Sequence, residues 1–236
     1  MTAVTPLGGG IIAAGEGRRL REDGFAMPKP LVPVAGVPLI EATLRNFLAA
    51  GVSSLVVIVN DQGRTCAEWV RDRFPHLDVD FIVKTTPSSL ASFREVSARI
   101  SSPRALISTV DSWCHPVAFA DFVAAARRRP PEASVLAVTP FVDDDNPLWV
   151  DADGDGRVRE VGSRQTDVAT AGVYLMSREV RAVVAPPSLG RLREFLAWLV
   201  AEGFPVYAER IETVVDIDRA SDIAHAEALA RADARP

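Results

Sequence analysis

Residues 8–40 read GGGIIAAGEGRRLREDGFAMPKPLVPVAGVPLI, and this stretch is the most informative part of the sequence. An apolar run of strand length at residues 9–14 leads into a loop that contains Gly15 and Gly17. Glycines leave backbone N–H groups free to converge on an anion, which is typical of loops that hold phosphates. The stretch therefore predicts a buried strand followed by an anion-binding loop.

Basic residues follow this loop at once. Arg18, Arg19 and Arg21 come directly after it, and Lys29 lies in the sequence Pro-Lys-Pro. The two prolines stiffen the backbone on both sides of Lys29, so its ammonium is held as a fixed point charge. We expect Lys29→Ala to lower turnover without changing the melting temperature. The alternative interpretation is an ordinary turn with a solvated basic surface, and the coincidence of the loop with Lys29 favours the phosphate site.

Two other glycine-rich motifs fit the letters less well. A P-loop needs Gly-Lys-Ser/Thr at a fixed spacing, and the chain lacks it here. A dinucleotide fingerprint on Gly8, Gly10 and Ala13 needs a preceding strand, but the first seven residues are too few and include Pro6. Neither motif explains the stretch.

Beyond residue 40, apolar runs of strand length alternate with amphipathic runs of helix length, which predicts an α/β fold. We expect strands at 55–60, 79–84 and 105–110, and helices at 38–50, 65–74, 88–100 and 117–129. After Pro130-Pro131 the pattern is mixed, with a strand at 134–139, a hairpin at 148–161, a strand at 171–176, a helix at 191–202, short strands around Tyr207 and Val214, and a helix at 220–232. The pattern predicts one α/β domain over 1–236, with a mostly parallel central sheet, helices on both faces and a mixed C-terminal half.

Composition excludes several classes of protein. The chain has 236 residues, 48% of them hydrophobic and 24% charged, which is typical of a globular protein with a sizeable core. A net charge of -5 argues against nucleic acid as a partner. No apolar run reaches the length of a membrane span. Two cysteines make no disulfide framework and no signal peptide is evident, so we expect a cytoplasmic protein.

Three motifs in the opening stretch together resemble the sugar-1-phosphate nucleotidyltransferases. The family's AAGxGxR[LM] loop, its Pro-Lys pair and its PVxGxPLI helix start appear here as residues 13–20, 28–29 and 33–40. The resemblance implies a GT-A-like fold that joins a nucleoside triphosphate (NTP) to a phosphorylated acceptor and releases pyrophosphate. It implies that Arg19 and Lys29 neutralise charge at the α-phosphate, and that the triphosphate is wrapped by Ala13, Ala14, Gly15, Glu16, Gly17, Arg18 and Arg19. Residues 1–130 would bind the NTP and residues 131–236 the acceptor.

Transfer to an α-phosphate brings two phosphates together, so the reaction calls for a divalent cation, which we expect to be Mg²⁺. Asp111 ends the strand at 105–110, at the edge of a parallel sheet where ligands bind, although it also fits a helix cap before Pro116. Asp216 and Asp218 alternate along a later strand and therefore share one side of it. One of them can join Asp111 on the metal while the other caps the last helix, and we rank Asp216 slightly above Asp218.

The acceptor site is marked by weaker signals. Thr86, Ser88 and Ser89 stand where the family has a turn that contacts base or sugar, and an ordinary helix cap explains them equally well. In the family a lysine binds the acceptor phosphate, and Arg164 is the candidate to take its place here. Gly172 matches the glycine of the strand that follows.

Two further metal motifs are incomplete. Residues 151–156 read DADGDG like the start of a calcium loop, but Gly162 stands where the bidentate Glu is required, so a polar hairpin turn is the better interpretation. Cys114 and His115 have no second Cys/His pair at ligand spacing, which argues against zinc.

The sequence therefore predicts a Mg²⁺-dependent nucleotidyltransferase whose acceptor is a sugar 1-phosphate, as in the synthesis of nucleotide sugars. Three alternatives remain: a cytidylyltransferase for phosphocholine or a similar phosphorylated alcohol, a GT-A-like glycosyltransferase, and an inactive homologue that senses nucleotides. The base, the acceptor and the choice between monomer and homo-oligomer stay open.

Overall fold

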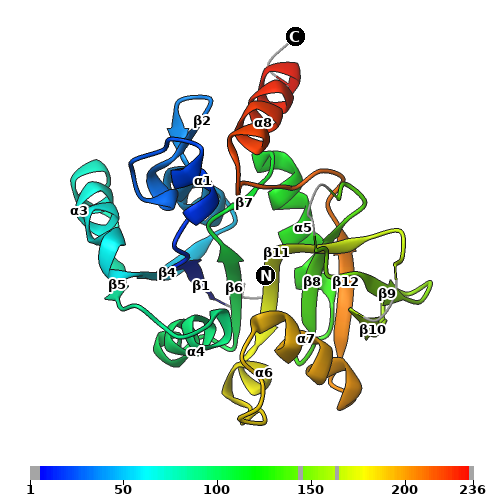
Figure 1. Cartoon of the computed structure of the whole chain (residues 1–236). Helices are drawn as coiled ribbons and strands as arrows, with labels where there is room; N and C mark the ends of the chain where they lie inside the picture. Colours follow the sequence, from blue (N-terminus) through cyan, green and yellow to red (C-terminus); the bar gives the residue numbers. More distant parts are fainter. Residues whose placement is uncertain (1–5, 143–145, 163–164, 234–236) are drawn as a thin grey trace.

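The fold is built on one large sheet, seen in a computed structural model that describes residues 6–142, 146–162 and 165–233 (Figure 1). Across these residues a seven-stranded sheet runs in the order β12-β8-β11-β6-β1-β4-β5. Its strands are β1 (Leu7–Ala13), β4 (Val52–Val59), β5 (Val79–Val83), β6 (Arg104–Thr109), β8 (Ser134–Thr139), β11 (Ala169–Ser177) and β12 (Val206–Arg210). β11 is antiparallel to both of its neighbours, and the other strands of the sheet all run one way. The expected α/β fold with a mostly parallel sheet is confirmed.

Helices cover both faces of this sheet, as expected (Figure 1). On one face pack α2 (Leu39–Ala49), α3 (Arg64–Arg73), α5 (Pro116–Arg128) and α8 (Ala220–Asp233). On the other face pack α4 (Ser89–Arg99), α6 (Arg178–Ala182) and α7 (Leu192–Ala201). Apolar side chains from both faces of the strands complete two cores, one on each side of the sheet.

The glycines of β1 let helices approach the centre of the sheet from both sides. A Cβ on Gly9 would lie 2.7 Å from Phe47 of α2, and a Cβ on Gly10 would lie 2.4 Å from Val96 of α4. Such separations are too short for carbon atoms, so only glycine permits this packing.

The structure also contains short elements that the sequence pattern does not predict. They are α1 (Arg18–Glu22), the 3₁₀ turns η1 (Lys29–Leu31) and η2 (Asp61–Gly63), the ladder of β2 (Pro33–Val34) with β3 (Val37–Pro38), α6, and the strand β7 (Ser112–Trp113). Two to five residues are too few to show a period of 3.6 or of 2, which is why hydrophobic periodicity misses them. The predicted hairpin forms from β9 (Val150–Ala152) and β10 (Val158–Val161).

The strand expected near Val214 is β13 (Val215–Asp216), and it lies outside the large sheet. It pairs with β7 in a separate antiparallel ladder. None of the helices in the described part of the chain is both long and apolar enough to cross a membrane.

Candidate active site

The glycine loop and Asp111 meet at one edge of the sheet because β1 and β6 are parallel neighbours. The loop leaves the end of β1, and Asp111 follows the end of β6. Gly17 has a φ of 60°, and a Cβ there would lie 2.8 Å from the Cβ of Lys29. Glycine is therefore required at position 17 both by the backbone conformation and by the passage of Lys29 beneath the loop.

Asn60, at the end of β4, holds the first residues of the loop. Its side-chain amide donates to the backbone carbonyls of Ala14 and Gly15, each at 3.3 Å, and its Oδ1 accepts from the N–H of Gly63 at 2.8 Å. Sequence analysis missed this residue. A polar side chain directly after a buried strand, on the strand next to β1, is the signal that points to it.

The short ladder of β7 with β13 brings distant carboxylates together. Asp216 pairs with Ser112, and the N–H of Ile217 donates to the carbonyl of Asp111 at 3.0 Å. As a result one oxygen each of Asp111, Asp216 and Asp218 lies within 4.8 Å of the others. Carboxylate oxygens are the ligands that Mg²⁺ prefers, so this group of three can hold a metal ion.

Lys29 reaches into this group of carboxylates. Its Nζ donates to Asp111 Oδ2 at 2.6 Å and to Asp218 Oδ1. Arg19 donates to the other oxygen of Asp218 at 3.1 Å. Of the residues predicted from the sequence, the structure thus gathers Arg19, Lys29, Asp111, Asp216 and Asp218 in one place.

The electrostatics of the site favour charged side chains. Burial by itself lowers the pKa of Lys29, but the carboxylates of Asp111, Asp218 and Asp216 outweigh this effect and raise its pKa above the usual range. Burial would also raise the pKa of Asp111, and the charge and hydrogen bond of Lys29, with a hydrogen bond to Thr109, hold it below its usual value. The pair is therefore an ammonium and a carboxylate, with the lysine side chain buried and the aspartate side chain 24% exposed.

Neither Asp216 nor Asp218 supplies the cap of the last helix. The carboxylate of Asp222 accepts from the N–H groups of Asp218 and Arg219, at 2.8 and 2.7 Å, where α8 begins. This corrects the expectation that one of the two alternating aspartates is the cap. The physical reason is that Asp222 lies inside the first turn, from which a carboxylate reaches back to these donors, and the side chain of Asp218 turns to Lys29 instead.

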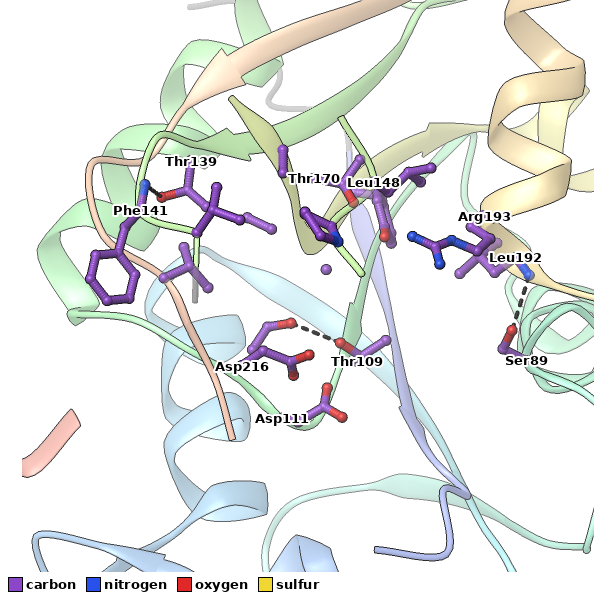
Figure 2. Close-up of a pocket in the computed structure, with 18 residues that line it drawn as sticks. Ser89, Thr109, Asp111, Thr139, Phe141, Leu148, Thr170, Leu192, Arg193 and Asp216 are labelled. Atoms are coloured by element: carbon purple, nitrogen blue, oxygen red, sulfur yellow. Dashed lines mark hydrogen bonds between the residues drawn. The ribbon is translucent and has the colours of Figure 1, made fainter. Parts of the chain in front are cut away.

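A cavity of about 350 Å³ opens beside the carboxylates (Figure 2). Asp111 and Asp216 form part of its wall, together with Thr109 and Ser112, whose hydroxyls share a hydrogen bond of 2.7 Å. The remaining wall carries hydroxyl and apolar groups and one guanidinium, from Ser89, Thr139, Phe141, Val142, Pro147, Leu148, Ala169, Thr170, Ala171, Gly172, Tyr174, Leu192, Arg193 and Val214. Such a mixed cavity is typical of a site for a small polar molecule.

Gly172 lines the cavity at a point where no side chain fits. Its φ is 71°, and a Cβ there would lie 1.9 Å from Ser112 Oγ and 2.7 Å from Thr109 Oγ1. The glycine predicted for the acceptor site therefore allows β11 to approach the segment that follows β6.

Three residues predicted around the acceptor have different surroundings. Ser89 lines the cavity, and its hydroxyl accepts from the N–H of Leu192 at 3.0 Å. Ser88 caps α4 by accepting from the N–H of Ala91, and the hydroxyl of Thr86 is 2.6 Å from that of Ser92. Ser88 and Thr86 are not among the residues that line the cavity.

Two of the remaining predicted residues, Glu16 and Arg18, lie at the glycine loop and at the start of the helix that follows it. Arg164 lies outside the described residues. Arg18 is exposed, with its guanidinium 3.6 Å from Glu22, and Glu16 is exposed on the loop. Arg193, which sequence analysis missed, faces the cavity from the first turn of α7 and donates to the carbonyl of Asn146 at 2.8 Å (Figure 2). An arginine between Leu192 and Glu194 at the start of a helix gives no signal of this placement in sequence.

The incomplete metal motifs form ordinary local structure. Asp153 accepts from the N–H groups of Asp155 and Arg157 in the turn between β9 and β10. His115 accepts from the N–H of Val117 as the cap of α5, and Cys114 is buried. The interpretation of residues 151–156 as a polar hairpin turn is confirmed.

Solved structures of nucleotidyltransferases share this fold. The inositol-1-phosphate CTP transferase of T. maritima has a TM-score of 0.79 and 20% identity, with 93% of this chain and 92% of that chain covered. A putative glucose-1-phosphate thymidylyltransferase of Bacillus anthracis has a TM-score of 0.81 and 16% identity, with 95% of each chain covered. At these identities the likeness concerns the fold.

Sequence relationships identify the family. The bifunctional IPC transferase and DIPP synthase of Rubrobacter xylanophilus is 33% identical over 202 residues, which are 80% of this chain and 41% of the relative. The chain thus spans about two fifths of the length of that relative. A model of the MobA-like NTP transferase domain matches residues 9–203, which is most of the chain. The loop, the lysine and the fold agree with this match, and the chain belongs to the MobA-like NTP transferase domain family.

Proposed function

We propose that the protein transfers a nucleoside monophosphate group from an NTP to a phosphorylated sugar or polyol and releases pyrophosphate. One observation carries this proposal: Lys29 and Arg19 meet the carboxylates of Asp111, Asp216 and Asp218 between the glycine loop and the cavity. A transferase of this kind needs cations for the phosphates, carboxylates for a metal ion and a neighbouring space for the acceptor. The site has all of these within reach of each other.

In this proposal the first part of the chain, about residues 1–130, binds the NTP. The backbone N–H groups around Gly15 and Gly17 bind the phosphates, and Arg19 and Lys29 neutralise charge next to the α-phosphate. Asp111 and Asp216 would hold Mg²⁺. When bound there, such an ion would offset the repulsion between the two phosphates.

The later part of the chain, about residues 131–236, supplies most of the acceptor site. An oxygen of the acceptor phosphate forms a bond to the α-phosphorus while the bond from that phosphorus to the bridging oxygen of the β-phosphate breaks, so pyrophosphate leaves. Thr109, Ser112 and Thr170 offer hydroxyls to a sugar or polyol, and Arg193 offers a guanidinium to an anionic or hydroxyl group. The volume of the cavity suits a molecule of hexose phosphate size.

Inositol 1-phosphate with CTP is the first pair to test. A solved structure with the same fold is named an inositol-1-phosphate CTP transferase, and a relative at 33% identity carries the name IPC transferase. Glucose 1-phosphate follows, because another protein with this fold is named for it. A glycosyltransferase would instead take a finished sugar nucleotide and would leave Lys29 without a function.

The test is a screen for pyrophosphate release with each common NTP against a panel of phosphorylated sugars, polyols and choline. We expect release only when NTP, acceptor and Mg²⁺ are all present. Asp111→Asn is expected to remain folded and to lose most of the metal-supported rate, because an amide is an uncharged and poorer ligand. Hydrolysis or transfer from a finished sugar nucleotide, without pyrophosphate release from any NTP, would refute the proposal.

A further inference from the structure

The carboxylates of the site already surround a cation. The side chain of Lys29 is only 6% exposed, and its Nζ contacts both Asp111 Oδ2 and Asp218 Oδ1. Those aspartates, with Asp216, form the group whose oxygens lie within 4.8 Å of one another. The ammonium therefore occupies the space that a divalent ion bound to the same oxygens would need.

An ammonium and a divalent ion cannot share this space. Both are attracted to the same group of carboxylates, and two cations so close together repel each other, all the more because the lysine side chain is buried. Either the metal ion binds through fewer oxygens beside Lys29, or Lys29 leaves. In both cases the ammonium opposes the binding of a metal ion to the nucleotide-free protein.

A bound triphosphate offers Lys29 another anion. Asp218 pairs with both Lys29 and Arg19, and Arg19 belongs to the helix that follows the glycine loop. The Cβ of Lys29 lies directly beneath Gly17 of that loop. Rotation of the lysine side chain alone can therefore move the ammonium from the carboxylates toward phosphates held by the loop, with the backbone of η1 in place.

We propose that Lys29 is the resident counter-ion of the three carboxylates, and that an NTP draws it away and so makes room for the metal ion. This inference rests on the proposed function, since it assumes that the loop binds the triphosphate. It predicts that metal ion and nucleotide bind cooperatively. Such a site is expected for Mg²⁺, which proteins commonly hold through one or two carboxylates together with substrate phosphates.

The experiment measures Mn²⁺ binding to the nucleotide-free protein by the paramagnetic resonance of the free ion. Lys29→Met removes the charge and keeps the length of the side chain, and we expect it to tighten Mn²⁺ binding by about tenfold or more. Lys29→Arg keeps the charge and is expected to bind Mn²⁺ as weakly as the parent. Lys84→Met is the matched control, because Lys84 is exposed and paired with Glu95, away from the three carboxylates.

A second substitution shows where the ion binds. Adding Asp111→Asn to Lys29→Met is expected to abolish the gain in affinity. Circular dichroism establishes that each variant is folded, and Lys29→Gln is a second neutral variant should Lys29→Met not fold. Mn²⁺ affinity that is unchanged or weaker in the folded neutral variant would overturn the inference.

The same measurements separate this inference from the proposed function. If the parent releases pyrophosphate from an NTP but loss of the lysine charge leaves Mn²⁺ affinity unchanged, the inference fails and the function stands. If Mn²⁺ binds more tightly to the neutral variant but no NTP yields pyrophosphate in the parent, the counter-ion is supported and the function fails.

Discussion

Replacing Lys29 by alanine is expected to lower both turnover and stability. A preorganised charge at the reacting phosphates is worth about 10²- to 10³-fold in kcat. The variant also leaves Asp111 without its cation, which we expect to cost about 2 kcal/mol and to lower the melting temperature by roughly 4–8 °C; the cost is moderate because water reaches Asp218. Steady-state kinetics and thermal unfolding measure the two effects.

The matched control is Lys84→Ala, which removes a lysine whose side chain is 53% exposed. It should change neither the turnover nor the melting temperature appreciably. A Lys29→Ala protein with the turnover of the parent at saturating NTP and acceptor would remove Lys29 from the reaction. The sequence alone predicts that Lys29→Ala loses rate and keeps its melting temperature. The burial of the ammonium in the structure adds the expected loss of stability.

Gly172→Ala tests how closely β11 must approach the site. The added methyl meets Ser112 Oγ at 1.9 Å and also needs a positive φ, so we expect loss of stability and a raised KM for the acceptor. Gly203→Ala is the control, because it has a φ of 81° but no heavy atom within 4 Å of the new methyl. The control should cost only the backbone strain, about 1–2 kcal/mol.

Denaturant unfolding compares the two glycine variants, and acceptor titrations give KM. Equal losses of stability in both would show that Ser112 moves aside without cost. An unchanged acceptor KM in Gly172→Ala would exclude this wall of the cavity from acceptor binding.

At the scale of elements, the start of α8 positions Asp218. Asp222→Ala removes the acceptor of two backbone N–H groups and is expected to cost about 1 kcal/mol. Because the segment that carries Asp218 is then held less firmly, Mn²⁺ binding in the presence of NTP should also change. Calorimetry on the nucleotide complex measures this affinity.

Glu194→Ala provides a comparison at the start of another helix. Glu194 accepts in the same way from the N–H groups of Gly190 and Arg191 where α7 begins, and α7 packs on the face of the sheet opposite to α8. This variant should leave the Mn²⁺ affinity as it is in the parent. A change of equal size in both variants would mean that a loss of helix capping in general, and not the placement of Asp218, alters the site.

The long elements were predictable from sequence because each has enough residues to show a period. The segment at 9–14 and the helix at 38–50 correspond to β1 and α2, with ends that differ by one or two residues. The ladder of β7 with β13 was not predictable, since each strand has two residues. This ladder decides that Asp216 lies beside Asp111, so the sequence could nominate both aspartates but could not place them together.

For the whole molecule, the reactivity of the two cysteine thiols measures global unfolding. Cys66 and Cys114 are buried, and burial raises the pKa of each thiol to about 12. At about pH 8 only a minute fraction of each thiol is the reactive thiolate. We expect a chromogenic disulfide reagent to modify neither thiol in the folded protein and both in concentrated guanidinium chloride. Rapid labelling of one thiol in the folded protein would show that this part of the core opens locally.

The cavity belongs to the whole molecule and could not be read from the sequence. Its wall draws on Ser89, Arg193 and Asp216, which come from separate helices and strands. A sequence motif reveals a site only where residues close together in the sequence act together, as residues 13–20 do. Arg193 has no such neighbours, and only the folded sheet with α7 packed on it brings its guanidinium to the cavity.

In the proposed reaction the acceptor phosphate attacks the α-phosphate of an NTP, and the destination of the oxygens of the acceptor phosphate tests this most directly. The acceptor is supplied with a heavy oxygen isotope in its phosphate, and the products are analysed by mass spectrometry. We predict that all of the label appears in the nucleotidyl product and none in pyrophosphate. The reason is that no bond between the acceptor phosphorus and its oxygens breaks in the reaction. Label in free inorganic phosphate, or a product without the acceptor phosphate, would contradict this reaction.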